Sequence, residues 1–399
     1  MVLQLGSTDR EARPADPRVY LGRYHESAMP ANACFRGECD DQWLPLGPLD
    51  GQPVRDLQAL LRELGFYPKG ELDGIYGYRT CSAVRLFQEH VRAVEGEVGI
   101  GKPDGVVGPH TDAHLQRWRR EAKSAPWSDG RASTEHTAWL ELLRAVREQA
   151  IGRGGSRALA AATAHTGTTD TLAPRAWGYE PEDIHLVGVR RREWITTGRR
   201  GNDDLFVLLV NGMTFKFAGS TDPNPSIAGR ADEPYIVPGQ HLYRFGWHKI
   251  SEPGRVYRAF KPLSHGPLVF RDVVDDNALT DEDVAAGATA NPSINIHWSG
   301  KGTSNWSAGC QVISGRAYID ERAEIVDCSA FASPNYAGLE RGTRGAYNVL
   351  LDLIAVFSDS IESTGSSRLL YTLIYERDLD VGSMGVEAGE MVRSLMGDG

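Results

Sequence analysis

A cysteine and a histidine in the C-terminal half of the chain have the spacing and surroundings of a nucleophile and its base. His297 lies at the end of an apolar run, and Cys310 follows thirteen positions later, after a loop rich in Gly, Ser and Thr. A thiol is a useful nucleophile only as a thiolate, and its free pKa is about 8.5. Because an imidazole can take the proton, the pair suits acyl transfer through a covalent intermediate. The competing interpretation is a small buried side chain, which is the commoner role of a lone cysteine.

The residues around Cys310 extend this candidate site. Gly309 would let a substrate approach closely, and backbone N–H groups at the turn could stabilise the oxyanion of a tetrahedral intermediate. Ser307 completes the predicted catalytic set with Cys310, His297 and Gly309. Three neighbouring side chains are predicted to contact the substrate, namely Trp298, Trp306 and Gln311.

A zinc site is the alternative chemistry. Three other histidines could gather with His297, namely His241, His248 and His265. The chain contains no His-Glu-x-x-His or similarly short-spaced ligand set to support this. Cys34 and Cys39 could form a disulfide across a short loop, and without a nearby histidine pair they do not suggest zinc. The sequence therefore predicts no metal and no cofactor.

The elements that must position the pair are short β-type runs separated by Gly, Pro, Asn and Asp. The predicted strands are 184–189, 205–210, 213–217, 242–247, 256–260, 268–271 and 294–297, with 347–357 and 369–375 closing the same sheet. Asn211-Gly212 joins two of them and is a strong signal for a two-residue hairpin. We expect one mostly-β domain over residues 181–376.

A different pattern occupies residues 46–118. A helix that begins at Pro53 and ends before Gly65 is predicted from four inward leucines, Leu57, Leu60, Leu61 and Leu64. A second helix is expected from Thr80 and a third after Gly108. Each follows an Asp-Gly-x-x-Gly turn, where glycine permits a positive φ.

This stretch resembles the peptidoglycan-binding domain family, a three-helix module attached to many wall hydrolases and transpeptidases. The matching positions are Leu57-Gln58, Leu64-Gly65-Phe66-Tyr67, Asp73-Gly74-Ile75-Tyr76-Gly77, Thr80, Ala83-Val84, Phe87-Gln88, Asp104-Gly105-Val106-Val107-Gly108 and Thr111. The spacer between Gln88 and Asp104 is longer than the family's. The resemblance implies binding to peptidoglycan. For this we predict exposed groups beside the turns, namely Tyr76, Tyr78 and Arg79.

The segment around the cysteine resembles the catalytic motif of the L,D-transpeptidase family. In that family a His at a strand end precedes a Ser-His-Gly-Cys turn. Ser307, Gly309 and Cys310 match the turn, and His297 matches the upstream base. The resemblance implies a β-sandwich-like fold and an acyl-enzyme formed with the peptidoglycan stem peptide.

The sequence departs from that motif at two places, both on the side of the cleft where the incoming acceptor amine would bind. Ala308 stands where the family has its second His, and Gln311-Val312 replace a small apolar residue and an Arg. Because these groups orient the substrate in the family, the choice between transferase and hydrolase stays open.

Composition sets the wider limits. A net charge of −10 argues against a nucleic-acid partner, whose phosphates would be repelled. No apolar stretch approaches the roughly 20 residues that span a bilayer. The expected fold class is multidomain α+β. We predict an extended arm over 1–45, a three-helix peptidoglycan-binding domain over 46–118, a helix and flexible linker over 119–180, a mostly-β L,D-transpeptidase-like catalytic domain over 181–376 and a tail over 377–399.

The leading functional hypothesis is a cysteine-dependent enzyme on peptidoglycan stem peptides, either a peptidase or an L,D-transpeptidase. The N-terminus lacks a charged-then-apolar signal pattern. We therefore expect synthesis in the cytoplasm and action on the cell wall after lysis, or as an effector delivered by a phage-like or contractile injection particle. The alternative is a non-catalytic wall-binding component of a phage-like particle.

Overall fold

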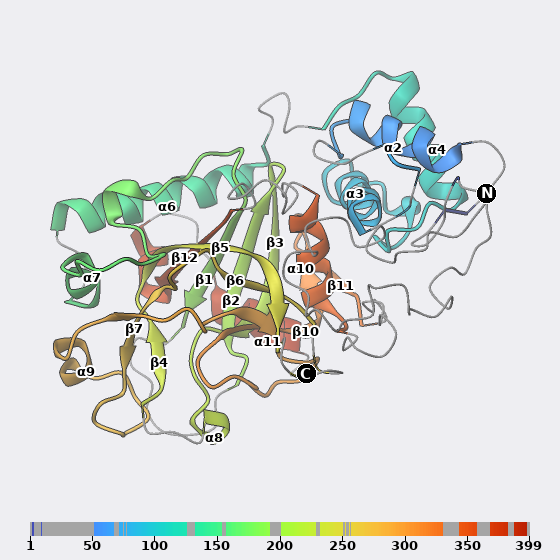
Figure 1. Cartoon of the computed structure of the whole chain (residues 1–399). Helices are drawn as coiled ribbons and strands as arrows, with labels where there is room; N and C mark the ends of the chain where they lie inside the picture. Colours follow the sequence, from blue (N-terminus) through green and yellow to red (C-terminus); the bar gives the residue numbers. More distant parts are fainter. Residues whose placement is uncertain are drawn as a thin grey trace.

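The computed structural model places a small helical domain beside a larger domain built around a β-barrel (Figure 1). It describes residues 2–3, 9, 52–67, 72–74, 76, 78–125, 132–153, 157–191, 201–228, 232–249, 252, 255, 257–329, 343–356, 368–381 and 387–396. The predicted arm over 1–45, with Cys34 and Cys39, lies outside the described residues except for Val2, Leu3 and Asp9. None of the described helices is long and apolar enough to cross a membrane.

The helical domain confirms the three predicted helices. Its elements are α2 (Pro53–Glu63), α3 (Tyr78–Glu89), a π-helical turn (His90–Val94), a 3-10 turn (Val98–Ile100) and α4 (Pro109–Arg120). The four leucines predicted to face inward are buried, and Gly65 ends the first helix with a φ of 83°. The Asp9 carboxylate accepts hydrogen bonds from the N–H groups of Val54 and Arg55, both at 2.9 Å, and so caps α2.

The two Asp-Gly turns are held by one repeated arrangement. At the first turn, Gln58 Nε2 donates to Asp73 Oδ1 at 2.8 Å, and Gly74 N donates to Gln58 Oε1 at 3.0 Å. The second turn repeats these bonds with Gln88, Asp104 and Gly105, at 3.1 and 2.8 Å. In each repeat the glutamine also donates to a threonine of the following helix, Thr80 or Thr111. The glutamines and aspartates of the family motif therefore build the domain.

The larger domain is a closed barrel of eight strands within the described residues. The strands are β1 (His185–Arg190), β2 (Asp204–Val210), β3 (Met213–Ser220), β5 (Gly239–His248), β6 (Tyr257–Pro262), β9 (Ile296–Trp298), β10 (Gln311–Ile319) and β12 (Leu369–Tyr375). Their order is β10-β3-β2-β1-β12-β5-β6-β9, and β9 pairs with β10 to close the ring. The resemblance implied a β-sandwich-like fold, whereas the structure shows a closed barrel.

Smaller elements surround the barrel. β11 (Ile325–Asp327) pairs with β10, and a separate sheet contains β4 (Pro234–Ile236), β7 (Leu268–Arg271) and β8 (Thr289–Ala290). Short helices are α8 (Pro225–Ala228) and α9 (Asp281–Ala285). The predicted hairpin between β2 and β3 is confirmed, because Asn211 and Gly212 both have a positive φ, 52° and 71°.

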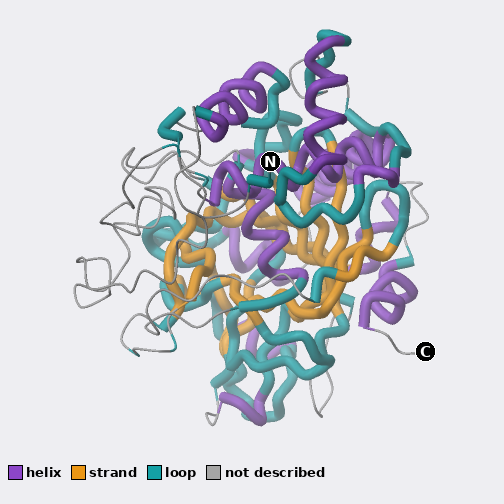
Figure 2. The backbone as a smooth tube through the Cα atoms, turned by 90° about the vertical axis from the view of Figure 1, so that its right-hand side faces the viewer, coloured by secondary structure: helices purple, strands orange, loops and turns teal. Residues whose placement is uncertain are grey.

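Helices cover the outer face of the barrel, over the segments predicted as a helix with a flexible linker (119–180) and as a tail (377–399). Three lie within 119–180, namely α6 (Thr134–Arg153), α7 (Arg157–Thr163) and a 3-10 turn (Pro174–Ala176). Two follow β12, namely a 3-10 turn (Glu376–Val381) and α11 (Ala388–Met396). Trp139 and Leu143 of α6 and Leu395 of α11 share one core with outward side chains of β1 and β2. Both segments are therefore parts of the barrel domain, and Figure 2 shows helices surrounding the strands.

The prediction of a strand over 347–357 is wrong, because α10 (Ala346–Ala355) is a helix. It packs apolar residues against inward side chains of the barrel and also contacts α3 of the helical domain. In Figure 1 it stands between α3 and the strands. A short apolar run that is buried on all sides has no polar face, so its periodicity does not distinguish a helix from a strand.

Candidate functional site

Cys310 and His297 lie on the same outer face of the barrel, on neighbouring strands. β9 and β10 run parallel, with Gln311 facing Ile296 and Val312 facing His297. Ile296 joins the inner core, and Gln311 bonds to the core residue Tyr371. Because side chains alternate along a strand, the neighbours of Ile296 and Gln311 project outward. The register thus places Cys310 beside Asn295, with His297 two residues further along.

The Cys310 sulfur is held by groups of its own turn and of the strand beside it. The backbone N–H of Asn295 donates to Sγ at 3.3 Å, and the Ser307 hydroxyl also hydrogen-bonds the sulfur. The thiol donates to the carbonyl oxygen of Ser293 at 3.5 Å. Part of the residue reaches the surface, but protein surrounds the sulfur, and this burial raises the pKa of Cys310. Asn295, Ser307 and the charge of Lys261 oppose that rise in pKa.

The imidazole of His297 is oriented by its Nδ1 atom. This nitrogen lies 2.9 Å from the carbonyl oxygen of Trp298, which can only accept, so Nδ1 carries the proton. The Tyr257 hydroxyl lies 3.0 Å from the same nitrogen. The assignment leaves Nε2 as the nitrogen that can accept a proton. Burial lowers the pKa of His297 to about 4, and Lys249 acts in the same direction.

The two groups do not form a hydrogen bond in this structure. Within the described residues, the thiol is bonded to Ser293, Asn295 and Ser307, and His297 is bonded to Trp298 and Tyr257. The ring of His248 stacks on that of His297, with centroids 4.2 Å apart. The arrangement is therefore a neutral thiol and a neutral imidazole on one face of two neighbouring strands, two positions apart in the register.

The loop before Cys310 is fixed by buried amides. Asn305 Nδ2 donates to the carbonyl of Asp222 at 2.7 Å, and Asn305 Oδ1 accepts from Ser307 N at 2.8 Å. Asn224 N donates to the Ser307 carbonyl at 2.7 Å. A Cβ on Gly309 would overlap Pro234 Cγ of β4, so only glycine lets the turn pass this close to the small sheet.

The predicted substrate contacts around the cysteine have three different environments. Trp306 is 63% exposed, as a side chain available for a ligand must be. Trp298 is half-buried against the core. Gln311 is fully buried, accepts a hydrogen bond from Tyr371 and donates to the Thr221 carbonyl at 2.9 Å. The prediction that Gln311 contacts the substrate is corrected, because its neighbour Cys310 projects from the opposite face.

Of the three predicted wall-binding residues of the helical domain, Tyr76 needs correction. Tyr76 is fully buried, and its hydroxyl donates to the Gly105 carbonyl at 2.7 Å, so it is a core residue rather than an exposed one. Arg79 is half-buried. The side chain of Tyr78 lies outside the described residues.

Sequence reasoning missed most of the surroundings of the pair. Asn295 and Lys261 were not considered, and Tyr257 was included only in a strand. His248 was considered as a zinc ligand. It stacks on His297, and its Nδ1 accepts from Asn295 Nδ2 at 3.1 Å, whereas His241 is buried between Thr171 and Val237. Within the described residues, no three His, Cys, Asp or Glu side chains could hold a metal ion.

Comparison with known proteins identifies the helical domain. Residues 50–115 match the family model described as "Putative peptidoglycan binding domain". The chain is also similar to the spore cortex-lytic enzyme of Bacillus subtilis (strain 168), with 40% identity over 65 residues, which are 16% of this chain and 19% of that protein. The chain thus spans about a fifth of that relative's length. No solved structure matches the chain. Residues 50–115 are therefore a peptidoglycan-binding domain, and the barrel lies outside the family match.

Proposed function

We propose that the barrel domain is a cysteine-dependent peptidoglycan hydrolase that cleaves stem-peptide bonds through Cys310, with His297 as base. The observation that carries the proposal is the position of the two side chains on one outer face of adjacent parallel strands. A peptidoglycan-binding domain on the same chain supports peptidoglycan as the substrate. The relative's name, a spore cortex-lytic enzyme, is in keeping with lysis.

The residues suit a two-step reaction. Cys310 Sγ attacks a peptide carbonyl while its proton moves to His297 Nε2, which is not used by the hydrogen bond to Trp298. The backbone N–H of Cys310 makes no hydrogen bond among the described residues, so it can donate to the oxyanion. The tetrahedral intermediate then expels the amine, which takes the proton from His297. Water, deprotonated by the same histidine, hydrolyses the thioester and restores the thiol.

Hydrolysis is favoured over transfer by the acceptor side of the turn. A transferase must orient an incoming amine, whereas water needs much less orientation. Ala308 offers no polar side chain, and the buried Gln311 points away from the cysteine. The resemblance to L,D-transpeptidases thus covers the residues around the nucleophile. It does not cover those that would orient an acceptor amine. Delivery by a phage-like particle is part of the proposal.

The test is digestion of purified sacculi by the full chain, with mass spectrometry of the released fragments. We expect Cys310→Ala and His297→Ala to lower the rate by at least about a hundredfold with little change in thermal stability. A matched control is Cys328→Ala, which removes a fully buried thiol bonded to the Arg316 carbonyl. It should keep the wild-type rate per folded molecule.

Three outcomes would contradict the proposal. Wild-type digestion by Cys310→Ala would exclude the cysteine as nucleophile. Dimer formation or exchange with an added D-amino acid, with little hydrolysed product, would replace hydrolysis by transfer. If the wild-type protein pelleted with sacculi but released nothing, the non-catalytic wall-binding role would hold instead.

A further inference from the structure

We propose that Lys261 binds a carboxylate of the acyl donor, so that the Cys310 site selects anionic acyl groups. This deepens the proposed function, because it takes Cys310 as the group that attacks the donor. The inference begins from the position of Lys261 in the sheet. Phe260 of β6 faces Ile296 of β9 in an antiparallel pair. The next positions along the two strands, Lys261 and Asn295, are therefore neighbours on the opposite, outer face.

The same face continues to the nucleophile. Asn295 lies beside Cys310 and donates its backbone N–H to Sγ. Lys261, Asn295 and Cys310 thus form one row across β6, β9 and β10. Gly246 of β5 leaves room for the lysine, since a Cβ there would stand 2.8 Å from Lys261 Cγ. The aliphatic part of Lys261 consequently lies along β5, and its charge is close enough to influence the Cys310 thiol.

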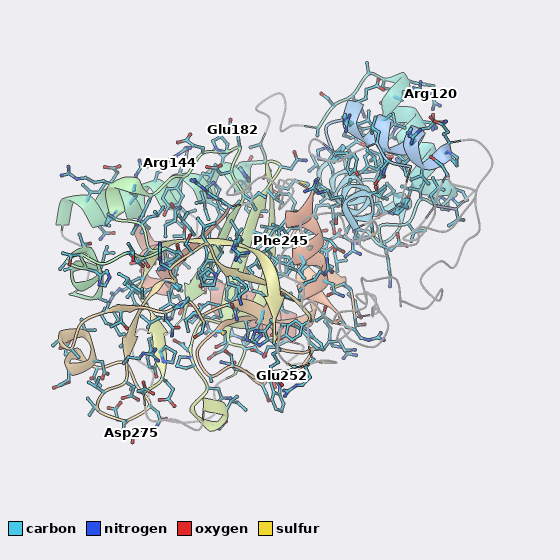
Figure 3. All side chains as sticks on the ribbon, in the orientation of Figure 1. Arg120, Arg144, Glu182, Phe245, Glu252 and Asp275 are labelled. Carbon is cyan, nitrogen blue, oxygen red and sulfur yellow. The ribbon has the colours of Figure 1, made fainter. Side chains whose placement is uncertain are left out.

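The Lys261 ammonium has no acidic partner within the described residues, although it is half-buried. The other cations near the site are already engaged. Lys249 and Arg255 both pair with Glu252, at 3.5 and 2.5 Å, and Arg244 donates to the carbonyl of Leu263. Figure 3 labels both Glu252 and the core residue Phe245, and the two labels lie well apart. A partly buried charge without a counter-ion is costly, so a ligand carboxylate would stabilise it.

The thiol is not the counter-ion in the substrate-free protein. Burial raises the pKa of Cys310, and the thiol donates a hydrogen bond to Ser293, as only its protonated form can. The Lys261 ammonium can therefore pair with a carboxylate of the substrate. Wall stem peptides carry free carboxylates beside their peptide carbonyls, and a donor of this class would pair with Lys261 while its carbonyl lies over Cys310.

Two small electrophiles test this charge preference without any need for turnover. Iodoacetate carries a carboxylate and iodoacetamide is its neutral analogue, and both alkylate thiols. The rate at Cys310 is followed by mass spectrometry of the peptide that contains it. We expect Lys261→Gln to lower the ratio of the iodoacetate rate to the iodoacetamide rate by roughly five- to tenfold. Lys261→Arg should keep the ratio, and Lys249→Gln should change it little. The thermal midpoint of each variant reports whether it is folded.

A second arm uses paired stem peptides that differ only in a free carboxylate or a carboxamide beside the scissile bond. The wild-type preference in kcat/KM for the carboxylate should disappear in Lys261→Gln. An unchanged alkylation ratio in Lys261→Gln would overturn the proposal. So would equal cleavage of the two peptides by the wild type, although Cys310 would remain the nucleophile. A lysine-dependent alkylation ratio without peptide cleavage would instead support the anion site and reject the hydrolase.

Discussion

Burial acts in opposite directions on the two reactive groups and favours the neutral form of each. It raises the pKa of Cys310 and lowers that of His297 to about 4. At neutral pH the resting pair is therefore a thiol and an imidazole rather than a thiolate and an imidazolium. In the proposed reaction the Cys310 proton leaves during the attack, and the Ser307 hydroxyl and Asn295 N–H are placed to stabilise the sulfur when it does.

This protonation state predicts the pH dependence of Cys310 alkylation by iodoacetamide. Only the thiolate reacts, so the rate should rise with pH through one inflection that lies above the pKa of an ordinary thiol. An ion pair would behave differently, since it would give a plateau from acidic pH upward. The measurement is the rate at the Cys310 peptide over a pH series, with His297→Gln as the control that should leave the inflection above neutrality. A plateau below pH 7 would contradict the neutral pair.

The placement of Cys310 and His297 on neighbouring strands could be predicted from sequence because its signal is local. A histidine at a strand end and a cysteine before the next strand must lie close when the two strands pair. Alternation along that strand could also have shown that Gln311 points away from the face that carries Cys310. Lys261 could not be found in this way. It reaches the site through the pairing of β6 with β9, and such a register between distant segments leaves no short-range signal.

At the scale of elements, the position of the cysteine turn depends on the small sheet beside it. Gly309 passes against Pro234, and Asn305 and Asn224 tie the loop to the segment after β3. The barrel fixes the positions of β9 and β10. The contacts of the turn with Pro234 and with the segment after β3 fix the position of Cys310 on the outer face.

We predict that Gly309→Ala displaces this turn. The loss of activity on sacculi, expressed as a free energy, should exceed the loss in the free energy of unfolding. The added methyl overlaps Pro234, and such overpacking costs about 1–3 kcal/mol. Pro234→Ala removes the opposing ring, so the double variant should recover part of the lost activity. Rates and thermal midpoints of the four proteins form a double-mutant cycle. Additive losses would show that the contact with Pro234 does not position the turn.

The elements themselves differed in how well the sequence predicted them. The Asn-Gly hairpin and the amphipathic helix α2 carry strong local signals, and both are confirmed. α10 is apolar on most sides because it lies between the barrel interior and α3, and its pattern was therefore misleading. The helix predicted within 119–180 is present as α6, but its packing on the outer face of the barrel, and that of α11, could not be predicted from a local pattern.

At the scale of the whole molecule, the peptidoglycan-binding domain is packed onto the barrel domain rather than tethered to it. Leu61 and Phe87 of that domain belong to the same core as Leu350 of α10 and Phe215 of β3. Arg92 of the π-helical turn pairs with Glu324 beside β11 at 3.0 Å. Because the two domains are packed together, the orientation of the peptidoglycan-binding domain relative to Cys310 is fixed. Peptidoglycan bound to it would therefore approach the barrel from one side.

A buried ionic cluster at this junction gives the last prediction. Asp352 of α10 pairs with Arg85 of α3 at 3.3 Å and with Arg258 of β6 at 3.5 Å, and all three side chains are at most 6% exposed. The carboxylate therefore links the peptidoglycan-binding domain to the strand that carries Lys261. Loss of one partner leaves buried charge uncompensated, so Asp352→Asn should lower the free energy of unfolding by about 3–5 kcal/mol.

The measurement is denaturant unfolding of the full chain, followed by limited proteolysis between the two domains. Glu252→Gln is the matched control, because it removes an exposed pair with Arg255, and such pairs contribute about 1 kcal/mol or less. Replacing the whole cluster by apolar residues, as in the triple variant Arg85→Met, Arg258→Met and Asp352→Leu, should give a more stable protein than Asp352→Asn, because no member of the cluster is then left as a buried charge without its counter-ion. Unfolding of Asp352→Asn at the wild-type denaturant concentration, with unchanged resistance to protease, would mean that the apolar contact of α3 with α10 holds the domains together without the ionic cluster.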